Sequence, residues 1–225
     1  MIVAIDGPAG TGKGTIASLI SKRLGFTYID TGAMYRCVTL KMIRKGVKLD
    51  APLSEIENLL KKIKIEFMNI SEKQHIFLDD EDVTEEIRTP EVSALASPTS
   101  QIQVIRDKLL IMQREYAKDT NVVMEGRDIT TVVFPNADIK IYLTATAGER
   151  AQRRYKELVA KGIQTTYEET LQAIMTRDEN DMNRKVAPLM IAKEAIVIDT
   201  TYMSIEEVYD KVHELITDYE MSKDM

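Results

Sequence analysis

The sequence predicts an α/β fold in which a doubly wound sheet of five parallel strands carries helices on both faces. Two features lead to this prediction: short apolar segments recur along the chain, and longer amphipathic patterns separate them. The segments are mostly apolar and often β-branched, which is typical of parallel strands buried on both faces. They comprise residues 2–5, 27–29, 122–124, 139–143 and 195–198.

The helical patterns begin and end at recognisable signals. Residues 15–24 place apolar side chains on one stripe and stop before Gly25, a favourable helix terminator. That stripe consists of Ile16, Leu19, Ile20 and Leu24. Capping-box pairs precede three later helices: Thr146 with Glu149, Thr166 with Glu169, and Ser204 with Glu207. The last helix is expected to bury Ile205, Val208, Val212 and Leu215.

One region interrupts the alternation of strands and helices. Residues 53–63 have a helical pattern, residues 64–69 and 75–78 resemble strands, and the polar residues 69–74 are expected to form the turn between them. We interpret residues 48–84 as a small α+β insertion. The chain is then a single domain, 1–225, with its core formed by residues 1–47 and 85–225.

Composition limits the classes to which the protein can belong. The net charge is −6, which argues against a nucleic-acid partner. A single cysteine, Cys37, and two histidines exclude an internal disulfide and argue against a metal site built from protein ligands. The chain meets Asp6 too early for a secretory signal peptide, and no apolar run approaches the roughly 20 residues that cross a bilayer. We therefore expect a cytoplasmic protein without a membrane partner.

The first strand leads into a glycine-rich loop and then directly into a helix, the context of a phosphate-binding loop. Backbone N–H groups, the helix N-terminus and a lysine would together bind the phosphates of ATP. The residues expected to do so are Gly7, Pro8, Ala9, Gly10, Thr11, Gly12, Lys13, Gly14 and Thr15. Gly14 stands where the general pattern has the Ser or Thr that ligates Mg²⁺. The ending Gly-Lys-Gly-Thr at residues 12–15 resembles that of the adenylate-kinase-like nucleoside-monophosphate kinases. This resemblance implies that Mg²⁺ is held through water and phosphate, without a direct protein ligand, and that Thr15 and Glu125 act through water.

Arginines distinguish a kinase from an ATPase or a GTPase switch, because joining two phosphates requires cations on both sides. Thr31 can cap the helix that carries Arg36, and Arg127 and Asp128 follow a central strand, where α/β sheets bind ligands. A spacing of four and three places Arg177, Asp181 and Arg184 on one helical face. Taken alone, Arg36 could be a solvated helix charge, and residues 125–128 could be a turn with a local salt bridge. The three residues on the later helix could be a surface ion-pair ladder. Together with the phosphate loop, they indicate a kinase whose acceptor carries a phosphate.

Over nearly its whole length the sequence resembles the bacterial cytidylate kinases. The resemblance rests on long strings, at residues 5–15, 30–36, 83–93, 124–129, 131–138 and 177–184. The insertion at 48–84 is similar to a segment of the bacterial type that the eukaryotic UMP/CMP kinases lack. The resemblance implies that ATP, with Mg²⁺, phosphorylates CMP or dCMP.

The resemblance also implies roles for individual residues. The phosphate of CMP would be held by Thr31, Arg36 and Arg127. Cytosine would be read by Ser97, Arg106 and Asp128. The ribose and the phosphate junction would be lined by Arg177, Asp181 and Arg184. Arg153 and Arg154 would approach ATP from a mobile helical lid at residues 146–184. The charge that builds up during transfer would be offset by Lys13, Arg36, Arg127, Arg177 and Arg184.

The chemistry of the base agrees with this assignment. Cytosine has an N4 donor, which suits an ionised Asp128, and acceptors that suit Arg106 and Ser97. One departure concerns Thr130, where the family usually has glycine. If that position required a positive φ, threonine would be strained and the geometry of Asp128 would change; we expect a local adjustment that preserves the site.

Two alternatives remain open. One is a related small-molecule kinase, similar to adenylate or shikimate kinase. The other is a nucleotide-gated switch that hydrolyses ATP or GTP slowly, although the guanine-reading string Asn-Lys-x-Asp is absent from the sequence. The preference between CMP and dCMP and the range of phosphate donors also stay open, and a monomer is the simpler expectation.

Overall fold

The computed structural model describes residues 1–71 and 73–223. The chain forms two compact units. The first consists of Met1–Tyr28 together with the chain from Asp119 onward, and the second is Ile29–Lys118. The predicted insertion, 48–84, falls inside the second unit. Among the described residues, no helix combines the length and apolar character that crossing a membrane requires.

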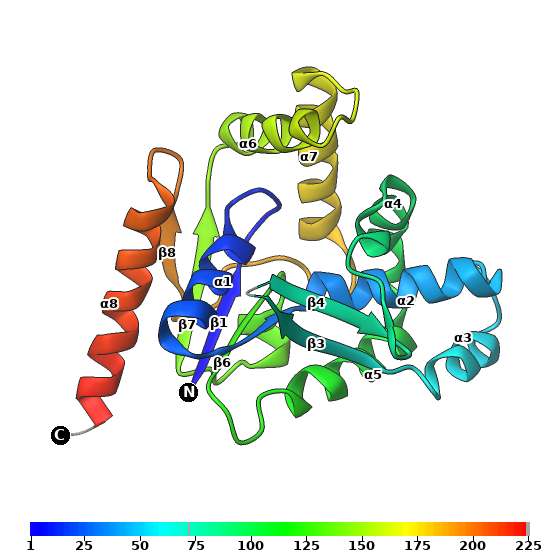
Figure 1. Ribbon diagram of the computed structural model, residues 1–225, viewed down its shortest axis with the longest axis horizontal. Coiled ribbons are helices and arrows are strands. Elements are labelled where there is room, and N and C mark those ends of the chain that lie inside the picture. Colours follow the sequence, from blue (N-terminus) through cyan, green and yellow to red (C-terminus); the bar gives the residue numbers. More distant parts are fainter. Residues whose placement is uncertain (72, 224–225) are drawn as a thin grey trace. The chain divides into compact units, whose positions relative to one another are not determined.

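The structure contains a five-stranded sheet (Figure 1). Its strands follow the order β2-β6-β1-β7-β8, and the pairs β1–β6, β1–β7 and β7–β8 are parallel. The bounds are β1 Ile2–Asp6, β2 Thr27–Asp30, β6 Val122–Gly126, β7 Ile139–Thr144 and β8 Ile196–Asp199. All five predicted strands are present, which confirms the predicted fold class. Because β1 lies in the middle of the sheet, the loop that follows it begins at the centre of the carboxyl edge.

Strand β8 differs from the prediction that all five strands are buried on both faces. Ile196 and Val197 are 43% and 50% exposed, respectively. The prediction is wrong for this strand because β8 is the last in the sheet order and pairs only with β7. An apolar segment of four residues has the same pattern at the edge of a sheet as at its centre.

Four α-helices belong to the first unit. They are α1 Lys13–Leu24, α6 Ala147–Ala160, α7 Tyr167–Asn183 and α8 Ile205–Lys223. Helix α1 packs against α8, and α6 packs against α7 (Figure 1). A short π-helical turn, η2, covers Ile129–Val133. Gly25 ends α1 in a left-handed conformation, as predicted, and the hydroxyls of Thr146, Thr166 and Ser204 accept the predicted capping hydrogen bonds. The reciprocal bond to the glutamate forms at Thr166 and Ser204, whereas the N–H of Thr146 donates to the hydroxyl of Thr201.

The core of the first unit lies between the sheet and the helices α1 and α8. Helix α1 contributes Ile16 and Ile20, with Leu19 partly buried beside them. Helix α8 buries Val208 and Val212, as predicted, and also buries two residues that were not predicted, Tyr209 and Ile216. The predicted burial of Ile205 is wrong: its side chain is 55% exposed because it occupies the first position of the helix. Leu215 is only partly buried.

The second unit combines four α-helices with a three-stranded antiparallel sheet. Its helices are α2 Thr31–Lys45, α3 Leu53–Leu60, α4 Pro90–Thr99 and α5 Gln103–Glu115, with a short 3₁₀ turn η1 at Glu86–Arg88. Its strands are β3 Ile65–Ile70, β4 Lys73–Leu78 and β5 Glu81–Asp82. The predicted helix and both predicted strands of the insertion are present. The predicted turn at 69–74 was too long, because β3 continues to Ile70 and β4 begins at Lys73. Glu72, within the predicted turn at 69–74, lies outside the described residues.

Candidate active site

The glycine-rich loop follows β1 at the carboxyl edge of the sheet. Gly7 adopts a φ of 147°, and a Cβ placed on it would lie 2.0 Å from the carbonyl oxygen of Leu143. No side chain can occupy that space, because the obstacle is backbone of the neighbouring strand β7. The loop is thus pressed against the sheet edge before it turns into α1, whose N-terminal N–H groups favour anions.

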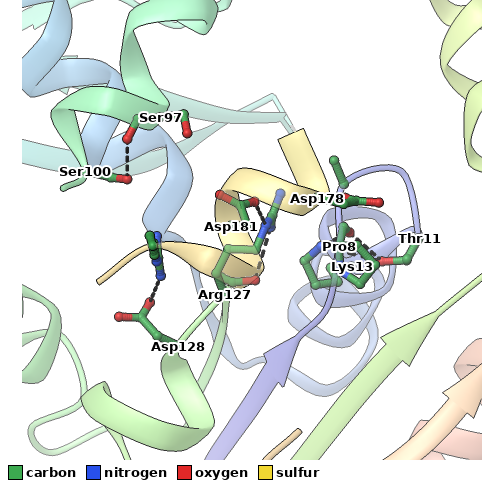
Figure 2. A network of polar contacts seen from close by, with 12 residues as sticks. Pro8, Thr11, Lys13, Ser97, Ser100, Arg127, Asp128, Asp178 and Asp181 are labelled. Atoms are coloured by element: carbon green, nitrogen blue, oxygen red, sulfur yellow. Dashed lines mark hydrogen bonds and ion pairs between the residues drawn. The ribbon is translucent and has the colours of Figure 1, made fainter. Parts of the chain in front are cut away.

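Lys13 is buried inside this loop. Its side chain is 4% exposed, and Nζ donates a hydrogen bond of 2.7 Å to the carbonyl oxygen of Pro8 and lies 3.5 Å from the hydroxyl of Thr11 (Figure 2). The pKa of Lys13 is lowered to about 7, mainly by burial and also by the nearby positive charges of Arg127 and Arg177, against the opposing effect of Glu125. A bound anion would reverse this trend, because it would favour the charged amine.

Glu125 lies beside the first turn of α1. The hydroxyl of Tyr28 donates to its carboxylate at 3.1 Å. A Cβ placed on Gly14 would lie 2.8 Å from the same carboxylate oxygen. Glycine after the lysine therefore leaves the room that Glu125 occupies. The general phosphate-loop pattern has a Ser or Thr hydroxyl after the lysine. In this protein the carboxylate of Glu125, from strand β6, lies next to that position.

Arg127 follows Glu125 by two residues and is paired with α7. Its Nε donates to Asp181 at 2.8 Å, and a second guanidinium nitrogen donates to the carbonyl of Gly126 at 3.1 Å (Figure 2). Burial alone would lower the pKa of Arg127, but the carboxylates around it, foremost Asp181, raise it above its ordinary value. The guanidinium therefore remains charged and is held in one orientation, as a phosphate-binding arginine must be.

Asp128 lies near Arg184, with 3.8 Å between carboxylate oxygen and guanidinium nitrogen, and both side chains are buried. Arg184 stands outside α7, which ends at Asn183, so it does not share the helical face of Arg177 and Asp181 as the spacing suggested. The chain leaves the helix there with an extended backbone, and Nε of Arg184 donates to the carbonyl of Ala187 at 2.5 Å. Arg177 is exposed on α7, close enough to Lys13 to lower its pKa.

Thr130 shows no strain from replacing glycine. It is not among the non-glycine residues that adopt a positive φ in the described part of the chain. Its backbone N–H and its hydroxyl both donate to the buried carboxylate of Asp6. Burial raises the pKa of Asp6, although these hydrogen bonds oppose the shift. The backbone strain that a positive φ would cause at Thr130 is therefore absent. The threonine instead adds a hydrogen bond from its hydroxyl to Asp6.

The arginines expected to approach ATP from the lid are engaged elsewhere in this structure. Arg153 donates to Glu149 at 2.9 Å and to the hydroxyl and carbonyl of Thr200 at 3.1 and 2.6 Å. Arg154 donates to Glu157 at 2.8 Å. A role for either in ATP binding stays a prediction.

A different residue of the same helix, Arg150, contacts the phosphate loop. It donates to the carbonyl of Ala9 at 3.0 Å and forms an ion pair with Asp178 of α7 at 2.6 Å. The sequence reasoning missed both residues of this pair. The only signal was an arginine just after a capping box, which does not distinguish a buried arginine from a surface one.

Four of the expected acceptor residues, Thr31, Arg36, Ser97 and Arg106, belong to the second unit. Asp30, and not Thr31, caps α2: its carboxylate accepts from the N–H of Ala33 at 2.9 Å, and Thr31 is the first helical residue. The predicted cap was therefore one residue too late, because both residue types are good caps and the backbone of Asp30 is the extended one. Asp30 also pairs with Arg36 at 3.0 Å. Within the described part of the chain, Nε of Arg36 is buried and makes no hydrogen bond.

Arg106 is buried in α5 and donates to the carbonyl of Ser100 at 3.0 Å. Its guanidinium carbon lies 5.8 Å from the centre of the Tyr35 ring. Ser97 accepts at its carbonyl a hydrogen bond of 2.7 Å from the hydroxyl of Ser100. Ser97 and Arg106 therefore both contact Ser100, at the end of α4. Their role in reading cytosine stays a prediction.

Comparison with known proteins identifies the family to which this geometry belongs. The family model described as cytidylate kinase matches residues 3–218. The chain is 51% identical over 213 residues to a cytidylate kinase of Caldicellulosiruptor bescii, covering 95% of this chain and 94% of the relative. It is 45% identical over 214 residues to a cytidylate kinase of Thermotoga maritima, covering 95% and 96%.

Among solved structures, an uncharacterized protein from Eubacterium ventriosum has the same fold, with a TM-score of 0.51, 11% identity, and coverage of 96% of this chain and 98% of that chain. At that identity the likeness concerns the fold alone. The family match and the two relatives each span nearly the whole sequence. The chain therefore belongs to the cytidylate kinase family.

Proposed function

We propose that this protein transfers the γ-phosphate of ATP to CMP or dCMP, giving ADP and CDP or dCDP, as a step of pyrimidine nucleotide metabolism. One observation carries the proposal beyond family membership: within the first unit, Lys13 of the phosphate loop lies close to the charge of Arg127, which Asp181 holds in place. A loop for donor phosphates and an oriented arginine next to it are what transfer between two phosphates requires.

The reaction is a direct in-line displacement. A phosphate oxygen of CMP attacks the γ-phosphorus of ATP, and the bond from that phosphorus to the β–γ bridging oxygen breaks, so that ADP leaves. The N–H groups of residues 10–15 and Lys13 hold the ATP phosphates. The charge on the transferred group is offset by Arg36, Arg127, Arg177 and Arg184. No covalent intermediate with the enzyme is needed.

Mg²⁺ fits this site through water and phosphate, without a protein cage. Among the described residues, no cluster of three or more metal-binding side chains is present. Glu125 is the carboxylate next to the start of α1, in the space that Gly14 leaves open. When bound with ATP, Mg²⁺ would neutralise charge on the β- and γ-phosphates, and Glu125 and Thr15 would order its waters.

Base selection depends on Asp128, Arg106 and Ser97, which we assign to cytosine by the family resemblance. An ionised Asp128 accepts a hydrogen bond from the N4 amino group of cytosine, whereas uracil presents a carbonyl oxygen there. A buried carboxylate facing an acceptor costs about 1–3 kcal/mol, so UMP should be disfavoured roughly tenfold to a hundredfold. By the same resemblance, Thr31 and Arg36 bind the CMP phosphate, Asp181 binds the ribose, and Arg153 and Arg154 approach ATP.

We also propose that residues 48–84 and the lid, 146–184, move on substrate binding and exclude water, which would suppress hydrolysis of ATP. The protein would act in the cytoplasm as a monomer. Its single, buried cysteine and its negative net charge support a reducing compartment and small-molecule partners.

The proposal is tested by an ADP-release assay with ATP and Mg²⁺, offering CMP, dCMP, UMP, AMP, GMP and shikimate separately. We expect rapid turnover with CMP and dCMP, and at least about tenfold lower kcat/KM with UMP. Preference for AMP or shikimate would contradict the assignment of CMP as acceptor, but it would leave the assignment of the phosphate loop to ATP unchanged. Slow ADP release that no acceptor changes would indicate a hydrolytic switch and contradict the proposal.

A further inference from the structure

Asp6 ends strand β1 and immediately precedes the phosphate loop. Its side chain is fully buried and accepts three hydrogen bonds from one short segment. The N–H of Ile129 donates at 2.9 Å, the N–H of Thr130 at 2.7 Å, and the hydroxyl of Thr130 at 2.6 Å. Both carboxylate oxygens are used, because Ile129 bonds to Oδ1 and Thr130 bonds to Oδ2.

The segment held by Asp6 directly follows the two residues assigned to the acceptor nucleotide. Asp128 precedes η2, and Ile129 and Thr130 are its first two residues. Asp128 has an irregular backbone, with φ −146° and ψ 23°, which no regular helix or strand maintains. Contacts beyond this irregular position therefore help to fix where Asp128 lies, in addition to the hydrogen bonds that Arg127 makes with Asp181 and Gly126. The hydrogen bonds from Ile129 and Thr130 to Asp6 join η2 to the central strand β1.

Of the two hydrogen bonds that Thr130 donates to Asp6, one comes from its backbone N–H and the other from its side-chain hydroxyl. A glycine at position 130 would provide the N–H but no hydroxyl. Thr130 is 2% exposed, so water does not readily replace its hydrogen bond to Asp6. A short bond from a hydroxyl to a buried carboxylate is of the strong, charge-assisted kind. Losing the donor while keeping the shape would leave the carboxylate facing a methyl group.

We propose that Thr130 is a positioning residue for the acceptor nucleotide, which acts through Asp6 to hold Arg127 and Asp128 in their binding geometry. This inference rests on the proposed function, because it concerns how well CMP is bound and distinguished from UMP. Thr130 itself contacts neither substrate. Its loss should loosen the placement of the arginine and the aspartate, while Lys13 and the N–H groups of the loop continue to bind ATP.

The test compares Thr130→Val with two further variants. Valine has the shape of threonine without the hydroxyl. Thr130→Ser keeps the hydroxyl and removes only the methyl group. Thr131→Val is the matched control, because it makes the same chemical change at the next residue, whose buried hydroxyl has no hydrogen-bond partner in the described part of the chain. For each folded variant, kcat and KM are measured for CMP, UMP and ATP, with thermal unfolding recorded by circular dichroism.

We expect Thr130→Val to lower kcat/KM for CMP by about tenfold to a hundredfold, the range for losing a hydrogen bond to a buried charge. The ratio of kcat/KM for CMP over UMP should also fall, while KM for ATP stays within about twofold. Thr130→Ser should restore most of the loss, and Thr131→Val should match the parent protein.

Other outcomes would overturn the inference. If Thr130→Val unfolds at a lower temperature but retains the kinetics and base preference of the parent, Thr130 is only structural. The same conclusion follows if Thr131→Val is equally impaired, or if Thr130→Ser is no better than Thr130→Val. Failure of the proposed function is seen separately, because the parent protein would then not phosphorylate CMP. If the parent uses another acceptor, the same three variants are compared on that acceptor.

Discussion

At the scale of single residues, the site places charges where water cannot solvate them well. Lys13 is buried near Arg127 and Arg177, and its amine donates to backbone and hydroxyl oxygens of its own loop. Burying a cation in this way costs free energy in the nucleotide-free protein. Bound phosphate would offset that cost, so we expect part of the affinity for ATP to come from relieving this unfavourable charge.

This leads to a prediction for Lys13→Met, which removes the charge and keeps a long apolar side chain. The folded-state pKa of about 7 lies below that of an unfolded lysine, about 10.4, so between these values the unfolded chain binds more protons. The destabilisation caused by Lys13 is therefore complete below pH 7 and fades as the pH rises toward 10. Lys13→Met should raise the melting temperature at pH 6 and raise it less at pH 9.

Thermal melts in phosphate-free buffer measure this effect, since phosphate could bind the loop. Lys22→Met is the matched control, because Lys22 is an exposed lysine on the same helix. It should change the melting temperature little at either pH. Turnover of Lys13→Met should fall by about 10²–10³-fold, as expected for a lost cationic donor. A lower melting temperature for Lys13→Met at pH 6 would contradict the proposed charge penalty.

At the scale of elements, helix α7 is fixed by a capping box at its N-terminus and by ion pairs with Arg127 and Arg150. Its N-terminus has a complete capping box: the hydroxyl of Thr166 accepts from the N–H of Glu169, and the carboxylate of Glu169 accepts from the N–H of Thr166. Near its C-terminus, Asp181 pairs with Arg127. Between them, Asp178 pairs with Arg150 of α6. The helix is therefore fixed by its cap and by two buried ion pairs.

Removing the cap should loosen the beginning of α7. Thr166→Ala loses the acceptor for the N–H of Glu169 and should destabilise the fold by about 1 kcal/mol. Far-UV circular dichroism in urea measures the change, since the chain has no tryptophan. Hydrogen exchange in residues 167–170 should accelerate in the variant. Thr176→Ala, which lies within the same helix, should be neutral or slightly stabilising because alanine is the better helix former. Equal losses in both variants would show that the cap contributes nothing specific.

At the scale of the whole molecule, the residues that we assign to the two substrates are distributed unevenly between the units. Every residue proposed for ATP lies in the first unit, in the phosphate loop, β6 or α6. The residues proposed for CMP come from both: Arg127 and Asp128 from the first unit, and Arg36 and Arg106 from the second. We therefore expect ATP to protect segments of the first unit alone, and CMP to protect segments of each unit.

Hydrogen-exchange mass spectrometry tests this division. A non-hydrolysable ATP analogue with Mg²⁺ should protect residues 7–15 and 122–128 and leave residues 29–118 nearly unchanged. CMP should protect segments in both units, including residues 97–106 and 127–130. At ligand concentrations of about 100 Kd, each ligand should stabilise the fold by about 2.7 kcal/mol. Protection by the ATP analogue concentrated in residues 29–118 would contradict the assignment.

The sequence by itself determined the features that depend on local patterns. The apolar segments predicted the five strands, Gly25 and the capping pairs predicted helix ends, and the loop from Gly7 to Thr15 predicted the phosphate site. These signals are local, because a strand period, a helix cap or a left-handed glycine needs only a few neighbouring residues.

Tertiary structure alone decided which partner each polar side chain has. It placed Arg150 against the phosphate loop, put Arg184 beyond the end of α7, exposed β8 at the sheet edge, and gave Thr130 a hydrogen bond to Asp6. Asp6 and Thr130 are 124 residues apart in the chain. Whether a polar group is buried, and what it then bonds to, depends on segments that only the fold brings together. For that reason the sequence could name the acceptor residues by resemblance but not the contacts that hold them.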